Sequence, residues 1–298
     1  MNIFSSITDI TKQIYMFWGN AVKNNSAQAK KEIDKLLERN AVRLVTKQYP
    51  KEAYRARIVE PKDYPNLVIG KQSKISGDQL FSGNSGIHGF LADNMGPPPI
   101  EKINNGRANK EKNPCLYLAS DIQTACSEVQ PCFESLISVI KFSLNLGMSL
   151  IDLRNLPKNL RSYNSKEDMD KLIDIIFCQS LLYFFSTPVS SKDEDIYKFS
   201  QYVAEYFSTK NIDGILYLSS HNYNNDAYNI VLFDPTKATI NEEYGELFKC
   251  LSIKTTFQSL SNKYRNENDI TILESKRERD PLLWHEILLL YKELIELQ

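Results

Sequence analysis

Asn211-Ile-Asp-Gly-Ile-Leu-Tyr-Leu-Ser219 combines a tight turn with the short apolar run of a buried strand. Residues 221–228 are polar, and Asn229-Ile-Val-Leu-Phe233 is a second apolar run of strand length. The sequence therefore predicts two strands close together in the chain, at 215–219 and 229–233, with a polar loop between them.

Helices and further strands are predicted on both sides of this pair. Helical spacing or a helix start signal is found within 1–48, over 121–128, from Ser165, from Asp193 and over 282–297. Further strands are predicted at 53–59, 115–119, 136–142 and 148–153. Asp121 is expected to cap the second helix, because its carboxylate can accept hydrogen bonds from free backbone amides. Strands mixed with helices, many joined by short connections, favour an α+β fold over a doubly wound sheet.

The charge and the cysteines exclude several classes of protein. The chain carries a formal net charge of −1, which predicts no bulk attraction to nucleic acid or to an anionic membrane. It has no basic segment followed by an apolar leader and no apolar run of about 18 residues, so we expect a cytoplasmic protein. The five cysteines are scattered without a C-x-x-C pair, which predicts reduced thiols and no metal site.

A segment rich in glycine and proline lies between the predicted strands at 53–59 and 115–119. Seven of the eleven glycines lie between Gly70 and Gly106, together with Pro97-Pro-Pro99. Glycine allows close backbone approach, and consecutive prolines stiffen an extended path. We interpret the segment as a lid or binding loop, with a surface insertion as the alternative.

Six short motifs carry polar side chains, and their order is more informative than any one of them. They are Tyr54-Arg-Ala-Arg57, Gly106-Arg-Ala-Asn109, Leu116-Tyr-Leu-Ala119, Thr124-Ala-Cys-Ser-Glu-Val129, Asp213-Gly-Ile-Leu-Tyr-Leu-Ser-Ser220 and Asn229-Ile-Val-Leu-Phe233. In these motifs the chain resembles the RES-domain family, which is named for its characteristic Arg, Glu and Ser. The subgroup with a longer amino-terminal extension is the most similar, because the stretch from Gly89 to Gly106 also matches it.

The resemblance implies an ADP-ribosyltransferase-like α+β fold with a mixed β-sheet core. It implies a RES domain at 49–235, an N-terminal helical extension at 1–48, and a C-terminal extension at 236–298 that ends in an amphipathic helix. Members of the family consume NAD⁺, often as toxins paired with a neutralising antitoxin. NAD⁺ is therefore the implied substrate, with no prosthetic group, and an antitoxin is an implied partner. The two extensions leave three roles open: a homodimer interface, an inhibitory cap, or the docking site for the antitoxin.

Carried over motif by motif, the resemblance also implies the site. The residues that would bind NAD⁺ are Arg55, Arg107, Tyr117, Ser219, Ser220 and Asn229. The implied catalytic residues are Glu128, Arg55 and Ser219. Ser220 is an alternative to Ser219, because the motif ends in two adjacent serines.

These residue types suit the chemistry of NAD⁺. Guanidinium groups such as those of Arg55 and Arg107 suit bidentate contacts to a pyrophosphate. Cleavage of the bond between nicotinamide and ribose builds oxocarbenium-like charge, which a fixed carboxylate such as Glu128 can stabilise. Tyr117 offers a ring for stacking and a hydroxyl, and Ser219 can hydrogen-bond the nicotinamide ribose or carboxamide.

Purely structural interpretations exist for the same residues. Taken alone, Arg55 or Arg57 would be a partner in an ion pair, and Glu128 would be a surface glutamate. His88 and His221 lie in polar loops, where a lone histidine is more often solvated than catalytic.

Two departures from the subgroup affect the turns around the site. Gln130 stands where an arginine is frequent, and Asn113 stands where glycine is usual. Asparagine tolerates the left-handed conformation, so we expect the turn at Asn113 to persist.

The sequence thus predicts an enzyme that cleaves NAD⁺ by hydrolysis or phosphorolysis, acting as a toxin or abortive-defence effector that depletes it. Two alternatives stay open. One is a protein mono-ADP-ribosyltransferase, and the other is a non-catalytic module that senses NAD⁺ or docks a partner.

Overall fold

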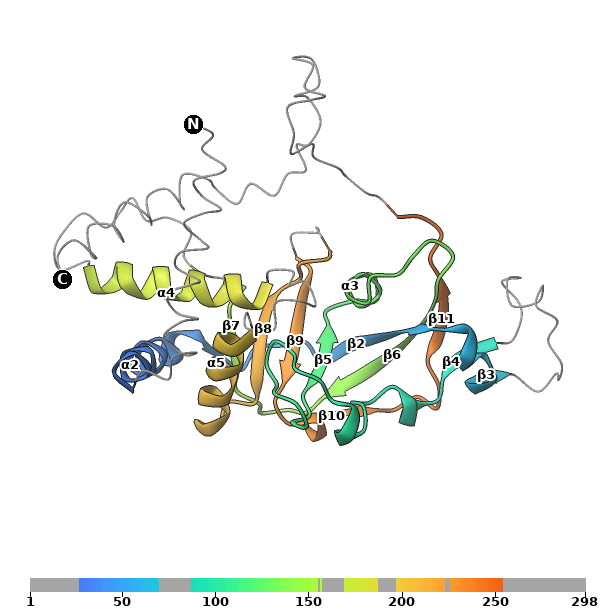
Figure 1. Ribbon diagram of the computed structural model, residues 1–298, viewed down its shortest axis with the longest axis horizontal. Helices are drawn as coiled ribbons and strands as arrows, with labels where there is room; N and C mark the ends of the chain where they lie inside the picture. The colour runs from blue at the N-terminus through green and yellow to red at the C-terminus, as the bar shows by residue number, and fades with distance from the viewer. Residues whose placement is uncertain are drawn as a thin grey trace, which may run out of the picture.

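The computed structural model describes residues 27–69, 87–154, 156, 169–186, 197–222 and 226–253 (Figure 1). In this part of the chain, strands and four α-helices form an α+β fold, as predicted. Several predicted features lie outside the described residues. They are the helical segment before residue 27, residues 70–86 of the glycine-rich segment, the helix starts at Ser165 and Asp193, and the C-terminal helix at 282–297.

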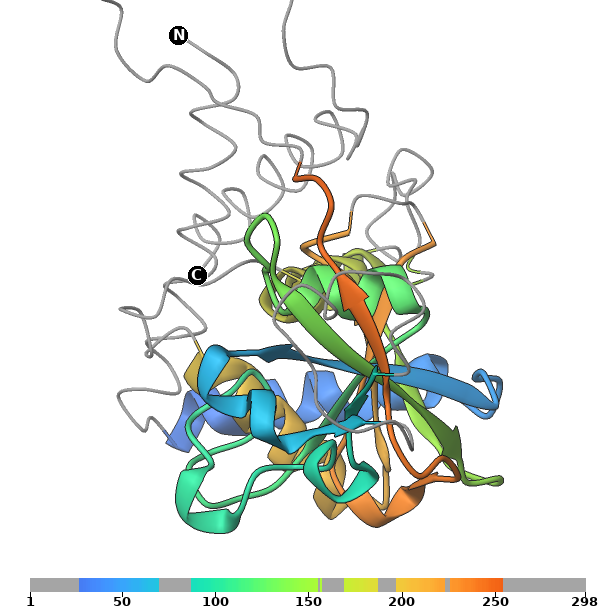
Figure 2. The same cartoon turned by 90° about the vertical axis from the view of Figure 1, so that its right-hand side faces the viewer.

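A nine-stranded sheet has the order β1-β7-β8-β9-β5-β2-β6-β10, and β11 also pairs with β6. Its strands are β1 (Val45–Thr46), β2 (Glu52–Val59), β5 (Leu116–Ala119), β6 (Leu136–Leu144), β7 (Leu150–Asp152), β8 (Gly214–Leu218), β9 (Tyr228–Leu232), β10 (Ala238–Ile240) and β11 (Glu246–Lys249). β7 and β8 run parallel and the other neighbours antiparallel, so the sheet is mixed. The strand direction turns widely across the sheet in both views, as the usual twist of β-sheets requires (Figures 1 and 2). β3 (Leu67–Ile69) and β4 (Ile87–Phe90) form a separate small sheet.

The sheet continues past residue 235, where the sequence predicts the domain to end. β2 pairs along one edge of β6, from Glu52 opposite Ser143 to Val59 opposite Leu136. β10 and β11 share the other edge of β6. These two strands have three and four residues, too few for an alternating pattern to identify them. Pairing with β6 draws residues 238–249 into the sheet.

Three helices gather beside β7 and β8 (Figure 1). They are α2 (Ala27–Leu44), α4 (Met169–Ser186) and α5 (Tyr197–Thr209). Their buried side chains share one core cluster, which includes Leu37, Phe177, Phe185, Phe199 and Phe207. The predicted N-terminal extension thus contributes α2 to the main core. No helix in the described ranges is long and apolar enough to cross a membrane.

The fourth helix, α3 (Ile122–Glu128), begins where the sequence predicts it. Asp121 caps it, because Oδ1 of Asp121 accepts a hydrogen bond from the Thr124 amide at 2.7 Å. α3 contacts β2, β5 and β6 through a small apolar cluster that includes Ala56, Ala119 and Ala125. This packing places the C-terminal end of α3 beside β2 and β5, which are paired at a single position, Tyr54 opposite Ala119.

Candidate functional site

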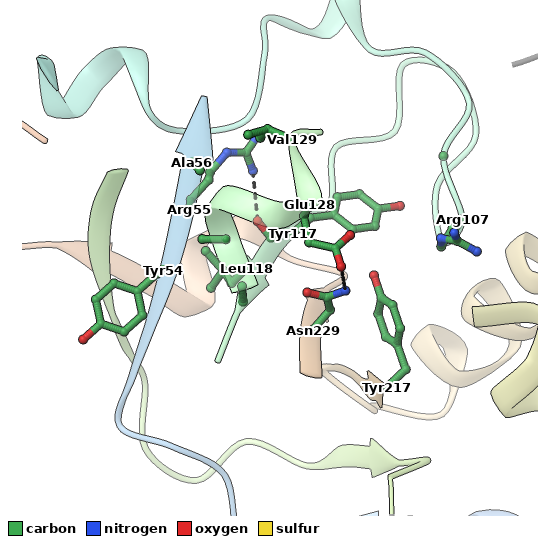
Figure 3. Close-up of a pocket in the computed structure, with 13 residues that line it drawn as sticks. Tyr54, Arg55, Ala56, Arg107, Tyr117, Leu118, Glu128, Val129, Tyr217 and Asn229 are labelled. Carbon is green, nitrogen blue, oxygen red and sulfur yellow. Dashed lines mark hydrogen bonds between the residues drawn. The ribbon is translucent and has the colours of Figure 1, made fainter. Parts of the chain in front are cut away.

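A pocket of about 300 Å³ lies where β2 and β5 separate, between α3, β8, β9 and the loop at 106–107 (Figure 3). This volume is at the lower end of the range for small-molecule sites. The wall is formed by Tyr54, Arg55, Ala56, Gly106, Arg107, Tyr117, Leu118, Ala119, Ala125, Glu128, Val129, Tyr217 and Asn229. Five of the predicted site residues are therefore brought together: Arg55, Arg107, Tyr117, Glu128 and Asn229.

Glu128, the last residue of α3, is held in one orientation by two donors from other elements. Its Oε1 accepts a hydrogen bond from Ser219 Oγ at 2.6 Å and another from Asn229 Nδ2 at 2.9 Å. Oε2 has no hydrogen-bond partner among the described residues, so it can accept one from a ligand. The short helix and its cap set the position of Glu128, and β8 and β9 set its orientation.

Ser219 acts on this carboxylate from behind the pocket wall. It is fully buried and does not line the pocket, and its Oγ accepts hydrogen bonds from the amides of His221 and Asn222 at 3.2 and 3.0 Å. The adjacent Ser220 is also buried, but within the described chain its hydroxyl has no hydrogen-bond partner. Of the two serines in the motif, Ser219 is therefore the one that contacts Glu128. It positions Glu128 and has no direct access to a ligand in the pocket.

Arg55 enters the site through the gap between β2 and β5. Its Nη1 donates to the backbone oxygen of Tyr117 at 3.4 Å, and no carboxylate in the described chain forms an ion pair with it. Burial, together with the positive charge of Arg57, lowers the pKa of Arg55 to about 10. A partly buried cation without a counter-ion favours an anionic ligand, which would restore the lost solvation of its charge.

Arg107 lies on the opposite side of Glu128 from Arg55 in Figure 3. Its Nη1 donates to the backbone oxygen of Phe184 at 3.2 Å, and its guanidinium carbon lies 5.9 Å from the ring centre of Tyr197. Contacts to α4 and α5 thus fix Arg107 at the edge of the pocket. The two predicted arginines are well placed to hold the two ends of an extended anion.

The hydroxyl of Tyr117 is used to hold the loop that carries Arg107. It accepts a hydrogen bond from the Ala108 amide at 2.9 Å and donates to Asn109 Oδ1 at 2.8 Å. Gln201 of α5 supports the same loop by donating to the backbone oxygens of Gly106 and Asn109, each at 2.9 Å. The ring of Tyr117 lines the pocket, so its contribution to a ligand is the ring face rather than the hydroxyl.

Tyr217 and Gln201 belong to the site but were not predicted from the sequence. Tyr217 lines the pocket, and its hydroxyl points toward the end of Glu128 (Figure 3). Burial raises the pKa of Tyr217, so it remains a neutral hydroxyl. A signal for Tyr217 exists, because it lies two residues before Ser219, and side chains two positions apart in an extended segment face the same side. Gln201 has no such signal, since only the packing of α5 brings it to the loop.

The histidines and the two departures from the subgroup lie at the margin of the site or away from it. His221 contacts Gln130 through their side-chain nitrogens at 3.1 Å, and Gln130 itself has a φ of 50°. The ring centres of His88 and Tyr244 are 4.0 Å apart, with the rings tilted by 32°, and His88 does not line the pocket. The turn at Asn113 persists as expected, because the Asn113 amide donates to the backbone oxygen of Lys110 at 3.2 Å, and its left-handed residue is Lys112, with a φ of 61°.

Within the described residues, no group of three or more His, Cys, Asp or Glu side chains is placed to hold a metal ion. All five cysteines are free thiols.

Residues 86–248 match the RES domain, which is more than half of the 298 residues. A chain from the crystal structure of the M. tuberculosis MbcT–MbcA toxin–antitoxin complex is similar at 12% sequence identity and a TM-score of 0.33, over 72% of this chain and 91% of that one. A comparison with curated proteins found no match. The match to the RES domain includes Arg107, Tyr117, Glu128, Ser219 and Asn229, and by its extent the chain belongs to the RES-domain family.

Proposed function

We propose that the chain cleaves the bond between nicotinamide and ribose in NAD⁺. The observation that carries the proposal is the arrangement of Glu128, whose Oε1 is held by Ser219 and Asn229 while Oε2 is left for a ligand. A carboxylate held in this way can accept a hydrogen bond from a ribose hydroxyl and lies close to the positive charge that develops on the sugar. Because its orientation is set before substrate arrives, little reorganisation is needed in the transition state.

The reaction begins with departure of nicotinamide. The electron pair of the broken carbon–nitrogen bond stays on the nicotinamide nitrogen, which becomes neutral, and the ribose C1′ becomes cationic. The oxygen of water then bonds to C1′, and one proton is released, so the products are ADP-ribose and nicotinamide. A phosphate oxygen in place of water would yield ADP-ribose 1-phosphate. Glu128 stabilises the cationic sugar in either case.

The other pocket residues bind and orient the dinucleotide. The rings of Tyr117 and Tyr217 supply flat aromatic surface in the pocket, which suits stacking against nicotinamide. Arg55 and Arg107 contact the anionic part from two sides, and Arg55 has no competing carboxylate among the described residues. Ser219 acts through Glu128 and is a positioning residue.

The biological role follows from the reaction and from the family. Depletion of NAD⁺ stops growth, which suits a toxin or a defence effector, and such a protein needs a neutralising antitoxin in the cell that makes it. We therefore also propose that a neutralising antitoxin binds this chain. Covalent transfer of ADP-ribose to protein would use the same pocket and is separated by the experiment below.

The test is nicotinamide release from NAD⁺ by the purified full-length protein, with and without phosphate. Glu128→Gln keeps the shape of the side chain but removes its charge, and we expect kcat to fall by about 10²-fold or more. Glu111→Gln, an exposed glutamate outside the pocket, is the matched control and should keep wild-type activity. Phosphate dependence would identify the acceptor. If folded wild-type protein releases no nicotinamide in either condition and labels no protein from radioactive NAD⁺, the proposal is wrong.

A further inference from the structure

A second cavity adjoins the pocket on the other side of Arg55. It has a volume of about 590 Å³, and its wall is formed by Arg55, Ala56, Arg57, Ile58, Asp63, Phe90, Asn94, Lys102 and Val129. Arg55, Ala56 and Val129 line both cavities, and they lie together beside α3 in Figure 3. We call this space the Arg57 cavity. The two cavities therefore share part of one wall.

The wall of the Arg57 cavity carries more positive than negative charge. Arg55, Arg57 and Lys102 are cations, and Asp63 is the one carboxylate among the residues that line it. Oδ2 of Asp63 accepts a hydrogen bond from the Glu60 amide at 3.2 Å, and no ion pair joins Asp63 to any of the three cations. The cations therefore lack a counter-ion within the described residues.

Arg57 is the least satisfied of these groups. Its Nη2 donates to the backbone oxygen of Gly96, but its buried Nε has no hydrogen-bond partner in the described part of the chain. Burial lowers the pKa of Arg57, because the charge has lost solvation that nothing nearby replaces. A buried donor on an unpaired guanidinium is unfavourable in an isolated protein, and an anionic ligand would satisfy both the donor and the charge.

The spacing on β2 suits a diphosphate. Arg55 and Arg57 are two residues apart on one strand, so their Cα atoms are about 6.6 Å apart and their side chains emerge on the same side. Two guanidinium groups on one side of a strand can each contact one phosphate of a diphosphate. Ile58 and the buried Phe90 add apolar surface to the same wall, and this surface suits a nucleobase.

We propose that the Arg57 cavity binds the adenosine end of the substrate, with Arg57 and Lys102 contacting the phosphate nearer the adenosine, while Arg55 and Arg107 keep the contacts proposed above. Arg55, on the shared wall, lies where the two halves of the dinucleotide join. This inference rests on the proposed function and adds a substrate class to it, because it selects dinucleotides over nicotinamide mononucleotide. Arg57 and Lys102 thus become specificity-determining residues beside the site assigned above.

The test uses the full-length protein with two readouts. Binding of ADP is measured by calorimetry, and kcat/KM for nicotinamide release is measured with NAD⁺ and with nicotinamide mononucleotide. In Arg57→Met we expect ADP binding and kcat/KM for NAD⁺ to fall at least tenfold, while kcat/KM for the mononucleotide changes less than twofold. Lys102→Met should give the same pattern with a smaller loss. Lys47→Met, at an exposed lysine outside both cavities, is the control and should not change either readout.

The outcomes separate this inference from the proposed function. ADP binding that depends on Arg57, in a protein that releases no nicotinamide, would support the Arg57 cavity and overturn the proposed function. Nicotinamide release that depends on Glu128, together with ADP binding that does not change in Arg57→Met, would support the proposed function and overturn the inference about the Arg57 cavity. An equal loss of activity on both nucleotides in Arg57→Met would also overturn the inference, because it would make Arg57 a general structural residue. Arg57→Lys keeps the charge and should recover part of the ADP affinity, which distinguishes loss of charge from misfolding.

Discussion

The two adjacent serines at the end of β8 allow a sharp test of how Glu128 is held. Ser219→Ala removes the hydroxyl that donates to Glu128 Oε1 and that accepts from the amides of His221 and Asn222. A hydrogen bond to a charged group contributes about 1.5–3 kcal/mol, and a buried amide left without an acceptor costs about 1–3 kcal/mol. Water in the pocket can replace the donor to Glu128, and His221 is only partly buried, so values at the low end apply. We expect Ser219→Ala to lose about 2–3 kcal/mol of folding free energy and about 4–12 °C in Tm.

The same change should alter catalysis in a specific way. Because Ser219 contacts Glu128 and does not line the pocket, kcat should fall by about 10- to 100-fold, which corresponds to about 1.4–2.8 kcal/mol. KM for NAD⁺ should stay within about twofold, since uniform binding of the nucleotide is not affected. Asn229 still donates to Glu128 in this variant, so activity should be reduced and not abolished.

Ser220→Ala is the matched control, one residue away and also buried, at 8% exposure. Its hydroxyl has no hydrogen-bond partner within the described residues, so the free energy of unfolding should change by less than about 0.5 kcal/mol and kcat should not change. Chemical unfolding and steady-state kinetics of the wild type, Ser219→Ala and Ser220→Ala measure these differences. Equal losses in both variants would refute the reasoning. So would a Ser219→Ala protein that is less stable but has wild-type kcat, because Ser219 would then be purely structural.

Three further changes test the support of the site. Gly106→Ala should lower Tm and weaken NAD⁺ binding, because a Cβ there would lie 2.5 Å from Asn109 Oδ1 and 2.9 Å from the Tyr117 hydroxyl; calorimetry and thermal unfolding check this, and unchanged values would contradict it. Tyr117→Phe keeps the ring and removes two hydrogen bonds to the loop, so KM should rise several-fold with a smaller change in kcat; a large fall in kcat alone would instead assign the hydroxyl a direct chemical role. Burial raises the pKa of Asp121, but hydrogen bonds from Thr124 outweigh burial, so the net pKa of Asp121 is lowered from its ordinary value of 3.8. The stabilisation by the Asp121 charge is therefore fully present above pH 3.8 and is lost as the pH falls through the lowered pKa. Asp121→Asn should therefore be less stable than wild type at pH 7, with a difference that shrinks below pH 3.8; a difference independent of pH would contradict the role of the charge.

The local parts of the fold could be predicted from the sequence because local rules determine them. Asp121 caps α3 as expected, since the carboxylate and the amide it binds are three residues apart. The predicted strands at 53–59, 215–219 and 229–233 match β2, β8 and β9 to within a residue at either end, because each segment has the length of a strand and is rich in apolar residues.

The parts that could not be predicted depend on contacts between distant segments. Gln201 reaches the loop at Gly106 across 95 positions of sequence, and no spacing rule relates them. The order of motifs placed Ser219 at the site, but only the three-dimensional contact with Glu128 shows that it acts behind the wall. β10 and β11 are strands because an edge of β6 was available to pair with, and their own residues carry too weak a pattern.

The position of β2 has a consequence for when the protein becomes complete during its synthesis. β2 is made early, but it pairs with β6, whose paired residues lie about 77 to 91 positions later, and it lies inside the sheet between β5 and β6. Arg55 can therefore take its place only after residue 144 has been made. The two donors to Glu128, Ser219 and Asn229, are synthesised later still, Ser219 directly after β8 and Asn229 within β9. A chain interrupted before residue 214 contains four of the five wall residues predicted from the sequence, yet its carboxylate has neither donor, so unfinished copies lack the oriented group on which cleavage of NAD⁺ would depend.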